Sequence, residues 1–141
     1  MLQAYPVILT KDGDSLVAEF PDVPEAMTVG SSKDNALSWA QDALVVALSG
    51  YLDDRRAIPK PSKPKAGQKT VTLPPLIASK LAIYQAMREQ GVTQARLATK
   101  LHCDARQIRR LLDLDHQSRL DLIDDALHVL GKKLVIDIQA A

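Results

Sequence analysis

The chain has 141 residues, of which 46% are hydrophobic, 25% charged and only 4% aromatic. That length suits one ordinary domain or two very small ones, and the composition is typical of a soluble globular protein. No apolar stretch approaches the ~18 residues of a membrane span, and no export signal is recognisable, so we expect a cytoplasmic protein without membrane contact. The single cysteine, Cys103, excludes an internal disulfide and a zinc site built on thiolates.

Charge is distributed unevenly along the chain. Residues 1–58 carry four Lys or Arg against nine Asp or Glu, a net charge of −5, whereas residues 59–75 have four lysines and no acid. Within residues 88–110 there are six bases and two acids. An acidic front and a locally basic back indicate two modules with different partners, the alternative being ordinary solvated surfaces.

The front of the chain follows a β-β-β-α order. We predict strands over residues 5–10, 15–20 and 26–29, with the first two joined by a tight turn at the Asp-Gly pair that ends at Gly13. So small a sheet buries little core, so a further strand or a partner is expected. Residues 70–73 are the candidate for that strand.

A helix is predicted to start at the capping segment 31–34. Apolar residues then recur at three- and four-residue intervals and predict the face that covers the sheet: Leu37, Ala40, Leu44, Leu48 and Tyr51. Trp39 lies off this apolar stripe.

Residues 58–69 contain three closely spaced prolines and four lysines, with almost no apolar content. Because proline has no amide donor, this stretch predicts a semi-rigid, solvated connector. The expected domains are therefore a front module over residues 1–57, a linker over 58–69 and a back module over 74–141.

The back module is predicted to be helical, apart from its end. Helices are expected over residues 76–90, 93–101, 104–112 and 118–130. In residues 132–139 apolar side chains alternate, which predicts a terminal strand. An exposed strand of this kind is a pairing hazard, so we hypothesise that it pairs with its copy in a homodimer or higher homo-oligomer. The fold class is α+β.

Residues 93–112 place two short amphipathic helices on either side of a tight turn, as a helix-turn-helix requires. Arginines at positions 106, 109 and 110 share the face opposite the apolar stripe, where they can contact guanine or phosphate. The alternative is a helical hairpin that binds no nucleic acid. The candidate DNA-binding residues are Thr93, Gln94, Arg96, Asp104, Ala105, Arg106, Gln107, Arg109 and Arg110.

This segment resembles the helix-turn-helix of Xre/Cro-type regulators, with Thr-Gln-x-x-Leu-Ala-x-x-Leu at residues 93–101 as its best match. The family usually has glycine after the last leucine, whereas His102 stands there in this chain. The resemblance therefore implies either a non-glycine residue in the left-handed conformation or a somewhat different turn geometry.

Residues 20–36 resemble the signature of HicB antitoxins: a strand ending in Phe-Pro-Asp-x-Pro, then a strand to Gly30 and a helix start. The family usually has glycine where Glu25 stands. The resemblance implies a HicB-type front module, a partial RNase H-like or double-stranded-RNA-binding-like fold, that blocks a small basic mRNA-cleaving toxin of the HicA type. The implied toxin-binding residues are Phe20, Pro21, Asp22, Val23 and Glu25. Simple core packing is the alternative for Phe20.

No constellation in the sequence predicts catalysis. His102, Cys103 and Asp104 are adjacent, and neighbouring side chains at a helix end point in divergent directions, which makes them poor joint ligands for a metal. Four aspartates of the front module could in principle bind magnesium, but ordinary acidic turns are the simpler explanation for them. These residues are Asp12, Asp14, Asp22 and Asp34. We expect no enzyme activity, no cofactor and no bound metal.

Two functional hypotheses remain from the sequence. The first is an antitoxin that binds a HicA-type toxin and represses its own operon by binding operator DNA as a dimer. The alternative is a stand-alone transcriptional repressor whose front module senses a small molecule. Direct RNA binding by the front module is opposed by its net charge, because phosphate contact dominates affinity for nucleic acids.

Overall fold

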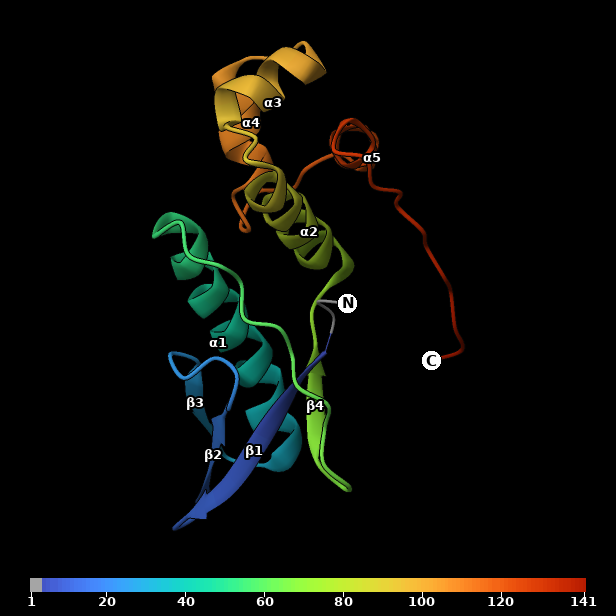
Figure 1. Cartoon of the computed structure of the whole chain (residues 1–141). Helices are drawn as coiled ribbons and strands as arrows, with labels where there is room; N and C mark the ends of the chain where they lie inside the picture. Colours follow the sequence, from blue (N-terminus) through green and yellow to red (C-terminus); the bar gives the residue numbers. More distant parts are fainter. Residues whose placement is uncertain (1–3) are drawn as a thin grey trace. The chain divides into compact units, whose positions relative to one another are not determined.

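The computed structural model describes residues 4–141 and divides the chain into two compact units (Figure 1). The sheet unit runs up to Ala78, and the helical unit comprises Ser79–Ala141. The predicted α+β class is confirmed. The units are described separately below.

The sheet unit is built on a four-stranded antiparallel sheet in the order β3-β2-β1-β4. Its register pairs Leu9 of β1 with Ala18 of β2, and Tyr5 of β1 with Val71 of β4. The fourth strand, β4, thus overlaps the candidate strand that the sequence predicts at residues 70–73. The strand bounds are β1 Ala4–Asp12, β2 Ser15–Glu19, β3 Met27–Gly30 and β4 Lys69–Thr72.

Helix α1 (Lys33–Asp53) packs on this sheet (Figure 1). Its start is capped by the Ser32 side chain, which accepts a hydrogen bond from the Asn35 amide. The buried face confirms the predicted stripe except at its first position, where Ala36 is buried and Leu37 only half-buried. The side chains of α1 that enter the core are Ala36, Ala40, Leu44, Leu48 and Tyr51.

Gly30, at the end of β3, lets the sheet and the helix approach closely. A Cβ atom added to Gly30 would lie 2.7 Å from the Cβ of Ala36, and closer still to the Ala36 backbone. Because backbone atoms cannot rotate away as a flexible side chain can, any larger residue here must displace the first turn of α1.

Replacing Gly30 by alanine is therefore expected to destabilise the sheet unit by roughly 1–3 kcal/mol through overpacking. The matched control is Gly50→Ala within α1, where an added Cβ meets no atom within 4 Å. That change is expected to stabilise by up to about 1 kcal/mol, because alanine is the better helix former. Urea unfolding followed by Trp39 fluorescence measures both, and equal stability of the two variants would contradict the close approach.

The segment 58–69 differs from the solvated connector that its composition predicts. Ile58 is only 3% exposed, and the Tyr5 hydroxyl donates a 2.7 Å hydrogen bond to the Pro59 carbonyl. The Asp22 carboxylate accepts from both the amide and the hydroxyl of Ser62, at 2.8 and 2.6 Å. Residues 58–62 are therefore packed on the sheet unit. The prolines fit because the bonds that hold this segment use the Pro59 carbonyl and the amide and hydroxyl of Ser62, so no proline has to donate an amide hydrogen.

The helical unit contains the four remaining helices, and the first turn of α2 belongs to the sheet unit. Their bounds are α2 Pro75–Gln90, α3 Gln94–Leu101, α4 Ala105–Leu111 and α5 Leu120–Val129. Each lies within two residues of its predicted span. The largest apolar side chains of this unit that are fully buried are Leu81, Ile83, Leu97, Ile108, Leu111 and Ile123. No helix in the described part of the chain is long and apolar enough to cross a membrane.

The predicted terminal strand is not formed. Residues 132–141 are extended but belong to neither a strand nor a helix in the structure. Val135, Ile136 and Ile138 are 75%, 62% and 90% exposed. An alternating apolar segment becomes a strand only when another strand supplies its backbone hydrogen bonds, and the sheet described above does not include this segment.

Candidate functional site

The first candidate site is the pair α3–α4 with the turn between them. The Thr93 hydroxyl accepts from the Arg96 amide at 3.1 Å and so caps the start of α3. At the other end His102 has φ 53° and ψ 43°, the left-handed conformation. Of the two possibilities left open by the missing glycine, the structure thus has a non-glycine residue in the position that glycine normally fills.

Helix α4 begins with a capping box. The Gln107 amide donates to the Asp104 carboxylate at 2.8 Å, and the Asp104 amide donates to the Gln107 side chain at 3.3 Å. Two of the predicted DNA-binding side chains therefore bond to backbone amides at the start of the helix. Their role in this structure is to define where α4 begins.

The remaining predicted DNA-binding residues lie on the surface of the helical unit. On α4, Arg106, Arg109 and Arg110 are exposed, while Ile108 and Leu111 are buried. The basic face and the apolar face thus separate as the sequence predicts. On α3, the exposed residues include two bases: the predicted Arg96 and also Lys100, which the sequence analysis did not single out. The signal available in the sequence was its position four residues after Arg96, which places both bases on one face of a helix.

The second candidate site is the loop that resembles the antitoxin signature. Phe20 is 2% exposed and Val23 is fully buried, in a pair of tight turns where the Val23 amide bonds to the Phe20 carbonyl at 3.1 Å. These two predicted toxin-binding side chains lie in the core, in agreement with the packing alternative for Phe20. Pro21 and Glu25 are exposed, and the half-buried Asp22 bonds to Ser62.

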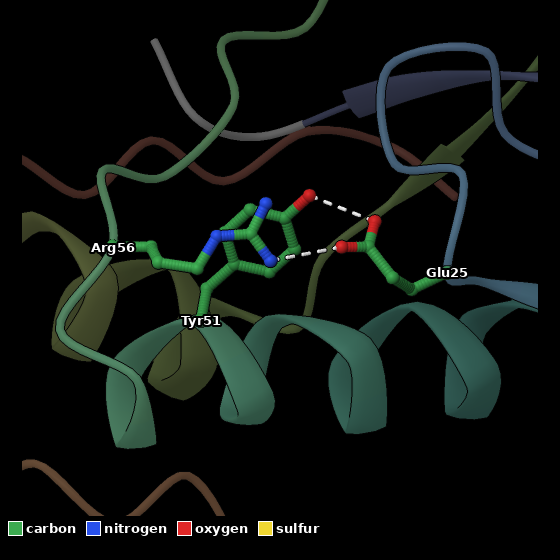
Figure 2. Close-up of polar contacts among 3 residues, drawn as sticks. All are labelled: Glu25, Tyr51 and Arg56. Carbon is green, nitrogen blue, oxygen red and sulfur yellow. Dashed lines mark hydrogen bonds and ion pairs between the residues drawn. The ribbon is translucent and has the colours of Figure 1, made fainter.

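Glu25 belongs to a polar cluster with Tyr51 at the end of α1 and Arg56 just beyond it (Figure 2). The Tyr51 hydroxyl donates to one oxygen of the Glu25 carboxylate at 2.8 Å, and Arg56 pairs with the other at 3.0 Å. The Arg56 guanidinium lies 4.0 Å from the centre of the Tyr51 ring. The pKa of the Glu25 carboxyl is lowered by the hydrogen bond that Tyr51 donates and, to a smaller extent, by the bond from Arg56. The pKa of the Tyr51 hydroxyl is raised, mainly by burial and then by its bond to Glu25.

These three residues form one end of a groove of about 540 Å³ lined mainly by α1 and β3. Its walls expose Met27, Trp39 and Val46, whose side chains are 59%, 53% and 72% accessible. The acidic residues Asp42 and Asp54 lie among them. The sequence analysis missed this groove, although the position of Trp39 off the buried stripe of α1 was a signal for it.

Among residues 4–141, no group of three or more His, Cys, Asp and Glu side chains is arranged to hold a metal ion. The pKa of the Cys103 thiol is raised, by burial and by Asp104, which disfavours the reactive thiolate.

A small antiparallel sheet with one covering helix, followed by a helical unit with an exposed basic helix pair, defines a two-unit α+β protein. Residues 4–82 match the family model described as the HicB-like antitoxin of bacterial toxin-antitoxin systems. The chain is 40% identical to antitoxin HicB 2 of Photorhabdus laumondii over 130 residues, 92% of each chain. It is 35% identical to antitoxin HicB of Escherichia coli K12, covering 92% of this chain and 95% of that one. The chain therefore belongs to the HicB-like antitoxin family.

The cluster in Figure 2 predicts a pH-dependent contribution to stability. Since the pKa of Glu25 is lowered from its ordinary 4.5, its carboxylate stabilises the fold above that value and loses this effect as pH falls through the lowered pKa. The difference in melting temperature between the wild type and Glu25→Gln should be constant near neutral pH and shrink in acid. The control is Glu19→Gln, on the exposed side of β2. A difference that persists unchanged in acid would contradict this assignment.

Proposed function

We propose that the protein is an antitoxin that binds and blocks a HicA-type mRNA-cleaving toxin through its sheet unit and represses its own operon by binding promoter DNA through α3 and α4. The proposal rests chiefly on the acidic groove of the sheet unit, whose apolar walls are exposed to solvent. The protein acts by binding alone, in the cytoplasm, without catalysis or a cofactor.

The groove suits a basic protein partner. Exposed apolar side chains gathered in one place mark interaction sites, and aromatic residues contribute strongly to such interfaces. Because Glu25 is already paired with Arg56, the carboxylates that favour a cationic surface are those of Asp42 and Asp54, in line with the net charge of −5 over residues 1–58. An RNA-cleaving toxin must hold phosphates and is cationic for that reason. We therefore shift the proposed toxin-binding surface to this groove, with Phe20 and Val23 supporting it from the core.

A charge placed on the apolar wall tests the toxin-binding surface. Val46→Lys introduces a cation at a position that is 72% exposed, so the fold tolerates it while the cationic toxin is repelled. Affinity for the co-encoded toxin should fall about tenfold or more, which is roughly 1.4 kcal/mol. Isothermal titration with a catalytically inactive toxin measures the change.

The matched control is Ile8→Lys, the same substitution at a 44% exposed apolar residue of β1 that does not line the groove. It should leave toxin affinity unchanged. Loss of affinity in Ile8→Lys with full affinity in Val46→Lys would place the toxin elsewhere on the sheet unit.

For DNA, α4 is the proposed recognition helix of a helix-turn-helix that enters the major groove. Arg106, Arg109 and Arg110 contact bases or phosphates, while Arg96 and Lys100 of α3 contact the backbone. Thr93, Gln94 and Ala105 lie at the helix starts that face the phosphates. A homodimer of the helical unit presents two such helices to successive half-sites. The extended tail, with its exposed alternating apolar residues, is the segment we propose to pair with the second copy.

Replacing Arg106 and Arg109 together by alanine is expected to abolish promoter binding and leave toxin neutralisation intact. Each lost phosphate contact should also reduce the slope of log affinity against log salt by about one. Electrophoretic mobility shifts and a growth-rescue assay report the two activities. Arg119→Ala, which removes an exposed arginine outside α3 and α4, is the control. Loss of neutralisation in the double variant would contradict the separation of the two functions.

A second candidate function is a stand-alone repressor in which the sheet unit senses a small molecule. The volume of the groove, about 540 Å³, favours it, since small-molecule sites span roughly 300–1,000 Å³. This function requires DNA release by the ligand and no stable complex with a co-encoded basic protein. The same titration and mobility-shift measurements distinguish it from the antitoxin.

A further inference from the structure

Lys80 of α2 is unusual because its charged end is enclosed within the helical unit. Of the charged side chains in residues 4–141, it alone is buried, with no exposed surface. Removing an ammonium from water is costly unless its protons are bonded. Burial accordingly lowers the pKa of Lys80, an effect that the charge of Asp113 opposes.

All three protons of the ammonium have an acceptor. The Nζ atom donates to the carbonyl of Arg110 at 2.9 Å, to the carbonyl of Asp113 at 2.8 Å and to the hydroxyl of Ser118 at 2.8 Å. A lysine has three N–H donors, so this set is complete. The acceptors lie in the last turn of α4 and in the connection from α4 to α5.

The contact with Arg110 concerns the helix that we propose to bind DNA. The last carbonyls of a helix have no partner within it and carry partial negative charge, which a cation stabilises. Helix α4 has only seven residues, and so short a helix depends on tertiary contacts for its stability. Its start is defined by the Asp104–Gln107 capping box, and its end by Lys80.

The backbone of Arg110 thus faces the interior while its side chain is on the exposed basic face. We propose that Lys80 is a positioning residue for DNA recognition, which sets the axial position and orientation of α4 by anchoring its last turn and the following connection to α2. This inference rests on the proposed DNA binding. It adds that a side chain with no contact to DNA determines how well the protein distinguishes its operator from other sequences.

The test uses the full-length protein and its Lys80→Met variant, which keeps the length of the side chain and removes the three hydrogen bonds. Affinity is measured for a duplex carrying the region upstream of its own gene and for a scrambled duplex of equal length. The ratio of the two affinities is expected to fall about 5- to 150-fold, as for the loss of one well-aligned base contact. Binding to the scrambled duplex should persist, because the exposed arginines remain.

A purely structural role for Lys80 would not produce this pattern, because partial unfolding weakens binding to both duplexes equally. The matched control is Ile123→Ala on α5, which opens a cavity in the same unit and keeps Lys80 and its three hydrogen-bond acceptors. Measured below its melting temperature, that variant should keep the wild-type ratio. An unchanged ratio in folded Lys80→Met overturns the proposal.

Two further measurements separate the possible failures. If Lys80→Met does not fold, Ser118→Ala is used instead, because it removes one of the three acceptors of the ammonium. The ratio of the two affinities should then fall by a smaller factor, and an unchanged ratio overturns the proposal. If the wild type does not prefer the upstream duplex, the proposed repression fails. The anchoring of α4 is then judged by hydrogen exchange in Ser118→Ala, where amides of α4 must exchange faster while those of α5 keep their rates.

Discussion

The pairing of β4 with β1 is the contact on which the rest of the sheet unit depends. Because β4 follows α1 in the chain, the segment between them must run back along the sheet to the β1 edge. That return begins at Arg55, whose φ of 56° turns the chain away from the helix. It brings Arg56 over Tyr51 and leaves Ser62 bonded to Asp22. The polar cluster at one end of the groove thus follows from the closing of the sheet.

The sheet unit and the helical unit use opposite kinds of surface. In the first, the exposed apolar side chains of Met27, Trp39 and Val46 share a groove with the carboxylates of Asp42 and Asp54. In the second, the accessible face of α3 and α4 is cationic. Apolar surface with negative charge favours a basic protein, and positive charge on a short helix favours nucleic acid. Under the proposed function, the two partners therefore do not compete for the same residues of the chain.

The helical unit also shows how a short helix acquires a defined position. Both ends of α4 are bonded to groups outside the helix. The side chain of Asp104 bonds to its start, and the ammonium of Lys80 bonds to its end. Each bond satisfies a backbone group that a seven-residue helix leaves unpaired. The position of the α4 backbone therefore does not depend on contacts made by the arginine side chains of that helix. A recognition helix needs such a fixed backbone if its side chains are to meet the major groove of DNA in a defined orientation.

The sequence by itself determined the order of the four sheet strands and the five helices, the buried face of α1 beyond its first turn and the capped start of that helix, because these depend on interactions within a few residues. For His102 it left two turn geometries open. Tertiary structure decided the rest. The packing of residues 58–62 depends on Asp22, which lies 40 positions from Ser62, and the place of the Lys80 ammonium depends on Arg110, which lies 30 positions away. Whether Phe20 faces a partner or the core was likewise settled by the packing of the sheet unit. Local periodicity carries no information about such distant partners. It likewise marked residues 132–139 as strand-like, but a strand needs a second one to supply its hydrogen bonds, and the sheet of this chain does not extend to that segment.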